Sequence, residues 1–558
     1  MTVSLPIPPG ALMMLGGLAL PLLPLRARQT VLLGLPPLVL ALVWMLPDGV
    51  SLQTHFLGWT LDLVRADALS RLFATVFLLM TFTGGLFALN QTRSAELAAA
   101  LAYAGGAVGV VFAGDVISVF IFWELMALAS TLVICAAGTT ARGAALRYAV
   151  IHLFGGVLLM AGIAGEIAAT GSIGFGAMVP DSPARWLILA GFLINAGAPP
   201  LAAWLPDAYP ESSWSGMVFL SAFTTKTAVY VLLRGFPGTE VLIPIGLFMV
   251  FYGIVYAILE NDVRRILAYS IVNQVGFMVT GIGIGTEVAL NGVAAHAFAH
   301  IIYKALLLMS AGSVLFMTGK RKCTDVGGLF RTMPVTTVCG IIGALSISAF
   351  PLTSGFVSKS MISDGAAHAH LPLVWFLLTA ASAGVFLHAG IKFPWFVFFQ
   401  RDSGLRPPDP PWNMRAAMVL FSAICIFLGV MPGPLYALLP YPVDYAPYTG
   451  SHVVSQLQLL LFSGLAFFLM LGWLKRTLTI TLDVDWFWRT GAWSGAGRAA
   501  DAAWAWIDRA ARATGRTAIL LARRHHGLEG VMARTWPTGA MAFWTAAMLA
   551  GYLLISYL

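Results

Sequence analysis

The sequence predicts an all-α integral membrane protein with about 14–16 transmembrane helices. Of its 558 residues, 59% are hydrophobic and only 10% are charged, whereas a soluble domain carries about 25% charged residues. Apolar runs of about 20 residues, the length that spans a bilayer, recur along the chain. The composition excludes a soluble globular domain and a disordered chain. The four cysteines are too widely spaced for a disulfide-stapled secreted domain.

The apolar runs also divide the chain. They lie near residues 8–25, 29–47, 69–90, 95–113, 115–137, 148–170, 184–206, 215–234, 241–260, 266–284, 288–318, 334–363, 372–399, 412–432, 455–474 and 537–557. From them we predict N-terminal transmembrane helices (1–94), a first repeat (95–236), a second repeat (241–400), C-terminal transmembrane helices (401–475), an amphipathic segment (476–536) and a last transmembrane helix (537–558).

Basic residues collect in alternate loops, as they do when every second loop faces the cytoplasm. The opposite side has only Arg65, Arg71, Arg185 and Arg234 near its loops. The formal net charge of +8 then reflects cytoplasmic loops that face anionic lipid. This pattern predicts that both termini lie on the non-cytoplasmic side. The cytoplasmic group comprises Arg26, Arg28, Arg93, Arg142, Arg147, Arg264, Arg265, Lys320, Arg321, Lys322, Arg331, Arg401, Arg406 and the basic stretch after Lys475.

The stretch 495–534 is too polar to span a bilayer. It mixes residues such as Trp504, Trp506 and Leu520 with arginines, a composition typical of an amphipathic helix on a membrane surface. Such a helix is about 60 Å long if it is continuous. The alternative is a basic linker, which Gly515 and Gly527 favour.

Lysines are rare and oddly placed. The chain has seven among its 32 basic residues, and Lys226, Lys304, Lys359 and Lys392 lie inside apolar runs. Lysine can lose its proton when it is desolvated, whereas arginine essentially cannot. The distribution is typical of buried cations that titrate. For Lys392, near the end of its run, the alternative is snorkelling to the membrane interface.

Glu124 is central in its run, within IFWEL. On insertion scales each mid-membrane charge costs about 2.5–3.5 kcal/mol, so such a residue is retained only when it is paired, neutralised or hydrated. We therefore treat Glu124, Lys226 and Lys304 as functional candidates.

The spacing of His296, His300 and Lys304 (i, i+4, i+8) places all three on one helical stripe. Imidazoles one turn apart can accept a proton at one nitrogen and release it from the other, which makes them suitable relay members. The alternatives are hydrogen-bonded core histidines or a two-histidine metal site. Against the metal site, we find no third ligand with suitable spacing. His388 and Lys392 repeat the His-Lys pairing more weakly.

Two runs contain helix-breaking prolines. One is interrupted near 195–206 and the other near 351–359. Inside a bilayer, broken helices survive where the freed backbone groups face protein or a water-filled cavity. The interrupted runs are the seventh and twelfth, and their odd offset predicts two inverted repeats of five helices. The alternative is a simple proline kink in each run.

Five motifs in order resemble the antiporter-like family, which contains the proton-translocating L, M and N subunits of complex I and the large subunits of Mrp-type sodium/proton antiporters. The resemblance covers about residues 60 to 480. Residues 481–489 (TLDVDWFWR) and the chain length are most similar to the Mrp D subunits. The motifs are FIFWELMALAS (120–130), WLPDAYPESSWSGMVFLSAFTTKTAVYVLLR (204–234), NDVRRILAYSIVNQVGF (261–277), HAFAHIIYKALLLMSAGSVL (296–315) and PLTSGFVSKSMI (351–362).

The resemblance implies two inverted five-helix repeats, each with one broken helix, and it implies roles. Glu124 matches the mid-membrane glutamate of the family, and Lys226 matches the lysine after the first broken helix. His296, His300 and Lys304 match the central relay, Lys359 matches the residue on the second broken helix, and Lys392 belongs to the exit region.

Asn195 departs from the family pattern, which usually has a lysine there that pairs with the glutamate. An asparagine can hydrogen-bond but cannot change its charge. The proton path through the first repeat, the first half-channel, is therefore altered, uses His152 or Lys226 instead, or is closed.

The resemblance implies a proton-translocating subunit of a multi-subunit Mrp-like monovalent cation/proton antiporter in the bacterial inner membrane, with other membrane subunits as partners. A sodium path needs oxygen ligands, which the lysine-rich path offers sparsely, so we expect it in a partner. We expect a transporter subunit without a cofactor of its own rather than a self-contained enzyme.

Three other functions stay open. One is a pump module of a redox-driven complex of the NADH dehydrogenase or membrane hydrogenase type, or a proton-conducting subunit of an inorganic-carbon uptake system. A structural subunit that has lost transport is a second, and the buried lysines argue against it. A membrane enzyme is the third, but HExxH and GxSxG are absent from the sequence.

Overall fold

The computed structural model describes residues 7–474, 483–486, 493–526 and 537–557. It divides into two units, Met1–Asp483 and Val484–Leu558. Among the described residues, twelve helices are long and apolar enough to cross a membrane, and four shorter apolar helices accompany them. The predicted all-α integral membrane fold is confirmed. Within the predicted amphipathic segment 476–536, residues 476–482, 487–492 and 527–536 lie outside the described part.

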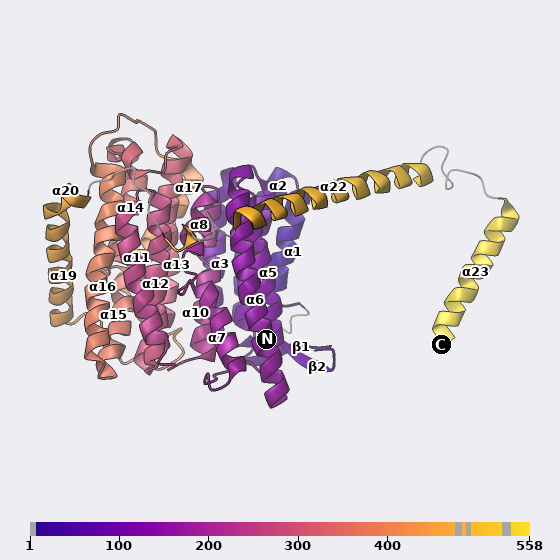
Figure 1. The fold of residues 1–558 in the computed structure, drawn as a ribbon, viewed down its shortest axis with the longest axis horizontal. Helices are drawn as coiled ribbons and strands as arrows, with labels where there is room; N and C mark the ends of the chain where they lie inside the picture. The colour runs from indigo at the N-terminus through magenta and orange to yellow at the C-terminus, as the bar shows by residue number, and fades with distance from the viewer. Residues whose placement is uncertain (1–6, 475–482, 487–492, 527–536, 558) are drawn as a thin grey trace. The chain divides into compact units, whose positions relative to one another are not determined.

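The helices of the first unit stand side by side as a bundle (Figure 1). Its N-terminal part contains α1 (Pro9–Ala19), η1 (Leu20–Leu22), α2 (Leu25–Met45), α3 (Ala68–Phe87) and η2 (Ala88–Asn90). The first predicted repeat contains α4 (Ser94–Phe112), α5 (Val116–Cys135), η3 (Thr139–Ala141), α6 (Arg142–Thr170), α7 (Pro183–Ala196), α8 (Trp204–Ala208), η4 (Tyr209–Glu211), α9 (Gly216–Leu220) and α10 (Thr224–Gly235).

The second predicted repeat and the helices after it complete the bundle. They are α11 (Leu242–Leu259), α12 (Val263–Ile284), α13 (Glu287–Thr318), η5 (Cys323–Asp325), η6 (Leu329–Arg331), α14 (Pro334–Ile347), α15 (Ser354–His368), α16 (Pro372–Val385), the π-helical η7 (Phe386–Lys392) and η8 (Trp395–Phe399), α17 (Trp412–Val430), α18 (Gly433–Tyr436), α19 (Gly450–Leu469) and α20 (Leu471–Leu474).

A β-hairpin that hydropathy did not predict connects α2 to α3. Strands β1 (Gly49–Phe56) and β2 (Trp59–Ala66) pair antiparallel, with Phe56 opposite Trp59. Asp67 follows the hairpin directly and caps α3, because its side chain accepts a hydrogen bond from the Ser70 backbone N–H at 2.8 Å. The hairpin thus leads straight into a transmembrane helix.

Both predicted interruptions are present. Helix α7 ends at Gly197 in the left-handed conformation, and helical structure resumes at α8. Helix α14 ends at Ile347, and α15 begins at Ser354 after a loop in which Ala349 and Leu352 have positive φ. The twofold inverted relation and the exact domain boundaries stay predictions.

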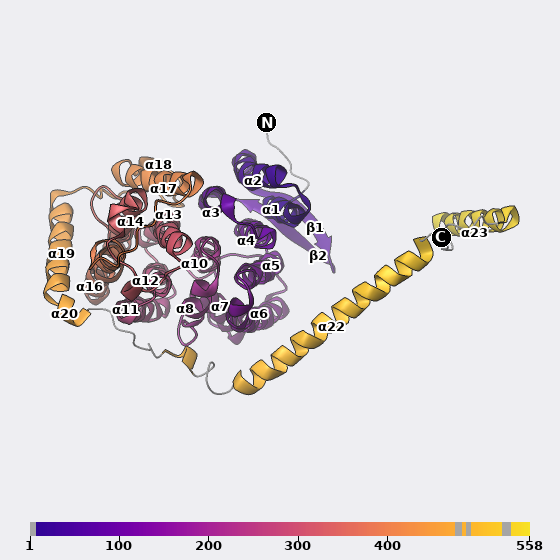
Figure 2. The ribbon, with the colours of Figure 1, turned by 90° about the horizontal axis from the view of Figure 1, so that it is seen from above.

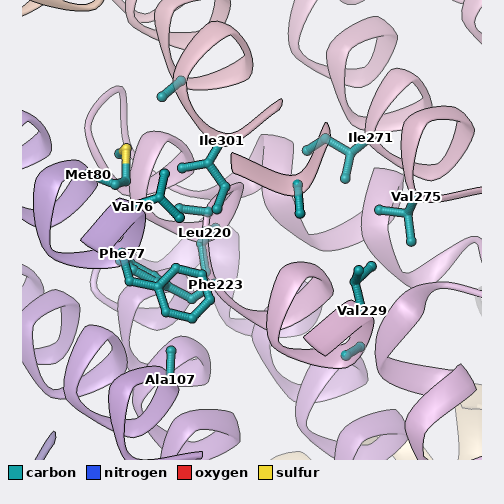
Figure 3. Packing of buried hydrophobic residues seen from close by; sticks show 14 of the residues in the cluster. Val76, Phe77, Met80, Ala107, Leu220, Phe223, Val229, Ile271, Val275 and Ile301 are labelled. Atoms are coloured by element: carbon teal, nitrogen blue, oxygen red, sulfur yellow. The ribbon is translucent and has the colours of Figure 1, made fainter. Parts of the chain in front are cut away.

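The interior of the bundle is formed by α10, α12 and α13, while α19 lies at its edge (Figure 2). Apolar side chains from several helices close the interior, and Figure 3 shows how they interdigitate. Phe77 of α3 and Phe223 meet edge to face with ring centroids 5.4 Å apart. Polar groups on the central helices are therefore held among closely packed apolar side chains.

The second unit contains α22 (Trp493–His526) and α23 (Thr538–Tyr557). The helix predicted within 495–534 is confirmed over the described residues of α22, and Gly515 does not interrupt it. Trp504, Trp506 and Leu520 are exposed on this helix. Its position on the cytoplasmic surface stays a prediction.

Candidate functional site

The predicted stripe on α13 lies in the interior of the bundle. His296, His300 and Lys304 are each 0% exposed, although a charged group is rarely buried without a partner. Helix α13 begins where Thr286 accepts a hydrogen bond from the Ala289 backbone N–H at 3.3 Å. This helix runs without interruption for 32 residues. Regular helical geometry therefore fixes the three side chains in one row.

His296 has hydrogen-bonding groups at both ring nitrogens. Its Nε2 lies 3.1 Å from Gln274 Oε1, and its Nδ1 lies 3.2 Å from Ser358 Oγ. Tyr303 donates its hydroxyl to the same Gln274 oxygen at 3.1 Å. The amide oxygen can only accept, so His296 carries its proton on Nε2. The Ser358 hydroxyl can donate to Nδ1 or accept from it, so the site holds either a neutral or a protonated ring.

His300 and Lys304 differ in their partners. Neither ring nitrogen of His300 has a hydrogen-bond partner in the part of the chain that the structure describes. The charges of Lys226 and Lys304 both act on His300. Lys304 donates from Nζ to the neutral hydroxyl of Ser270 at 2.8 Å. This hydroxyl, unlike a carboxylate, does not fix the lysine in its charged form.

Lys226 lies just after a third interruption, which was not predicted from the sequence. The run predicted as continuous over 215–234 is broken in the structure, because helix α9 ends at Leu220 and α10 begins at Thr224. The break frees the Ser221 carbonyl, to which Lys226 Nζ donates at 2.7 Å; it also donates to Thr225 Oγ1 at 3.1 Å. Lys226 is 0% exposed.

Lys359 lies on α15, directly after the second predicted break. Its Nζ is 3.4 Å from the Ile347 carbonyl oxygen and 5.2 Å from the centroid of the Phe277 ring. It also borders a cavity of about 780 Å³ whose other lining residues include Asp364 and Asp444. The α14 break exposes the carbonyl that Lys359 uses, and the cavity adds polar surroundings beside the ammonium group.

Lys392 has a different environment, at the end of the π-helical η7. Its Nζ donates to the carbonyl oxygens of Ala257, Ile258 and Glu260 at 2.6, 2.8 and 2.6 Å. These carbonyls lie at the C-terminal end of α11, where no further helical turn supplies N–H donors. Lys392 is 1% exposed, so snorkelling does not describe it. It caps a helix, and its predicted exit role stays a prediction.

Glu124 lies apart from this row, between α5 and α6. Its carboxylate fits against the glycine pair of α6, because a Cβ at Gly156 would lie 2.1 Å from Glu124 Oε1. Asn195 is beside it: its Oδ1 lies 3.7 Å from the place of a Cβ at Gly155. The structure thus places Asn195 and Glu124 against two successive glycines of α6.

The uncharged members of the site were not predicted from the sequence. Ser270, Gln274, Tyr303 and Ser358 provide most hydrogen bonds to the α13 stripe. The available signal was the presence of amide and hydroxyl residues within apolar runs, since such groups need partners inside a membrane. Among the described residues, no group of three or more His, Cys, Asp and Glu side chains is placed so that it could hold a metal ion.

Residues 113–385 match the family described as NADH:quinone oxidoreductase/Mrp antiporter, transmembrane. The match lies in the central part of the chain. A Na(+)/H(+) antiporter subunit of Alkalihalophilus pseudofirmus is 31% identical over 318 residues, which cover 52% of this chain and 64% of that protein. The chain spans less than two thirds of the length of the first curated relatives it matches.

Two solved structures share the fold. One is a chain of the Mrp complex from Dietzia sp. DQ12-45-1b, with a TM-score of 0.69 and 20% identity over 82% of this chain and 98% of that chain. The other is a chain of the membrane-bound sulfane sulfur reductase, an archaeal respiratory membrane complex. It has a TM-score of 0.72 and 23% identity over 99% of this chain and 100% of that chain. The predicted resemblance is confirmed by the family match.

Proposed function

We propose that this chain is a proton-translocating membrane subunit of a multi-subunit Mrp-like monovalent cation/proton antiporter. Its partners are other membrane subunits, and its place is the bacterial inner membrane with both termini on the non-cytoplasmic side. The observation that carries the proposal is the buried row formed by Lys226, the α13 stripe and Lys359.

The row has the properties that proton transfer requires. The charges of Lys226 and Lys359 both act on His296, so a proton that arrives at one lysine changes the energy of a proton at the histidine. Lysine and histidine can each exist charged or neutral inside a protein. A purely structural interior gains little from buried cations, because each mid-membrane charge costs about 2.5–3.5 kcal/mol.

The cavity beside Lys359 supports an aqueous exit. It has a volume of about 780 Å³, and Ser363, Asp364, Asp444 and His452 line it together with Lys359. Polar lining groups can hold bridging waters, each of which needs two to four partners. A proton that leaves Lys359 would thus meet water in this cavity.

The ligand chemistry favours protons over sodium in this chain. Sodium prefers hard oxygen ligands, and the described part of the row offers lysines and histidines with hydroxyl and amide neighbours. We assign any sodium or potassium path to a partner subunit.

The test uses inverted membrane vesicles that contain this chain and the products of its neighbouring genes. A proton gradient is imposed, and its collapse is followed with a pH-sensitive dye on addition of sodium or potassium. Vesicles that lack only this chain are the control. We expect cation-dependent collapse in the complete vesicles alone. Equal collapse in both preparations would contradict the proposal.

A second candidate is a pump module of a redox-driven complex. The observation that favours it is the fold likeness over 99% of this chain to a chain of a respiratory membrane complex. In the same vesicles, proton movement that appears only with a redox substrate and ignores sodium and potassium would support this candidate instead.

A further inference from the structure

Several buried polar atoms gather between α5, α6 and α7 without partners. Both side-chain atoms of Asn195, Oε1 of Glu124 and Nε2 of His152 have no hydrogen-bond partner within the described ranges. Asn195 is 0% exposed and His152 is 1% exposed. Native interiors pair more than about 90% of their buried polar groups, either directly or through water. Such a group of atoms points to a small hydrated site.

The positions on α6 explain why these atoms meet. Tyr148, His152 and Gly156 follow one another at spacings of four residues and therefore lie along one stripe of the helix. The Glu124 carboxylate rests at Gly156, and the Asn195 amide rests at Gly155. His152 is thus one helical turn, about 5.4 Å of rise, from the glycine against which the carboxylate lies.

His152 is held so that its Nε2 makes no hydrogen bond within the described residues. Its Nδ1 lies 2.9 Å from the Tyr148 carbonyl oxygen, which can only accept a hydrogen bond. The proton of the neutral ring is therefore on Nδ1, and Nε2 carries the free lone pair. The ring stacks on Tyr148 at 3.8 Å and meets Trp204 edge to face at 4.6 Å. These two rings hold the orientation of Nε2.

Other charged groups near α6 are already engaged. Asp207 of α8 accepts two hydrogen bonds from Arg147, at 2.6 and 2.9 Å. Lys226 of α10 donates to Ser221 and Thr225. Helix α5 contributes Glu124, and α7 contributes the neutral Asn195. His152 is therefore the side chain of this cluster that can become a cation.

We propose that His152 exchanges a proton with Glu124 through water held by Asn195, and so supplies the switchable positive charge of the first half-channel. The O–H bond of the Glu124 carboxylic acid breaks and an N–H bond forms at His152 Nε2, which leaves a carboxylate beside an imidazolium. The reverse transfer returns the proton from Nε2, because the Nδ1–H stays donated to Tyr148. This inference rests on the proposed function.

The test compares initial rates of proton transport in vesicles with equal amounts of the assembled complex. His152→Phe keeps an aromatic ring between Tyr148 and Trp204 but cannot take a proton. His152→Gln is a second variant, for the case that the first does not accumulate. Asn195→Lys in each background places a titratable amine against Gly155. The control is His55→Phe, at an exposed position of the β-hairpin.

We expect each His152 variant to lower the rate at least tenfold, or about 1.4 kcal/mol. Asn195→Lys should restore it in the double variants, and His55→Phe should have no effect. A normal rate in the His152 variants would overturn the inference, as would a loss that Asn195→Lys does not restore. A wild-type complex that moves no protons would contradict the proposed function itself, on which this inference rests.

Discussion

The choice of lysine over arginine is decided residue by residue by the surroundings of each ammonium group. Lys226 and Lys304 donate to a carbonyl and to hydroxyls, which are neutral acceptors. A permanently charged arginine would be costly at these positions, whereas a lysine can become neutral. Several arginines of the chain are instead paired near helix ends, as in Arg147–Asp207 and Arg234–Asp67.

Gly156→Ala tests whether proton transport depends on the close fit of the Glu124 carboxylate against Gly156. A Cβ there would lie 2.1 Å from Glu124 Oε1, so the carboxylate must rotate away at a cost of about 0.5–1.5 kcal/mol. We expect the proton transport rate to fall by up to about tenfold. Gly143→Ala on the same helix is the matched control, since only the flexible end of Arg147 lies near it, at 3.4 Å. Equal rates for both variants would show that the position of the Glu124 carboxylate does not affect proton transport.

At the scale of elements, the breaks in the helices place the lysines. The α9–α10 break presents a carbonyl to Lys226, and the α14–α15 break presents one to Lys359. Backbone groups freed inside a membrane need such partners. The interruptions are therefore parts of the site.

Gly429→Ala tests the second break. Helix α17 passes so close to it that a Cβ at Gly429 would lie 2.4 Å from the backbone of Leu352 and Thr353. Overpacking of this kind typically costs about 1–3 kcal/mol, so we expect a lower melting temperature and slower proton transport. Gly433→Ala, with open space around it, is the control. A melting temperature that stays at the wild-type value would contradict the close packing.

Lys392→Met tests the cap on α11. The substitution keeps an unbranched side chain but removes the three hydrogen bonds that Lys392 donates to these carbonyls, and a hydrogen bond from a charged group contributes about 1.5–3 kcal/mol. We expect a clearly lower melting temperature of the purified complex. Lys320→Met, at an exposed position, is the control. An unchanged melting temperature with lost transport would show that Lys392 acts on protons and not as a cap.

Hydropathy and prolines predicted the spans and the two proline-containing breaks, because bilayer thickness and missing backbone donors act locally. Three features escaped prediction. The β-hairpin lies between spans, the break after Leu220 has no proline or glycine at Ser221–Phe223, and the π-helical stretch of η7 and η8 differs in hydrogen bonding and not in hydropathy. Neither hydropathy nor proline content carries a signal for these three features.

At the scale of the whole molecule, the bundle holds its titratable groups in an interior closed by α10, α12 and α13. Helical spacing alone predicted that His296, His300 and Lys304 share one stripe of α13, and in the structure all three are buried. The partners of His296 come from α12 and α15, which meet α13 only in the folded bundle. Sequence spacing therefore predicted the stripe on α13 but not the hydrogen bonds that hold its side chains.

The measurement that tests the central claim most directly is the initial rate of cation-driven proton movement in inverted vesicles that carry Lys304→Ala. Lys320→Ala, at an exposed position, is measured beside it at equal amounts of assembled complex. The account predicts that Lys304→Ala abolishes proton movement while Lys320→Ala retains the wild-type rate. A wild-type rate in the Lys304→Ala complex would contradict the claim that protons pass along the buried row.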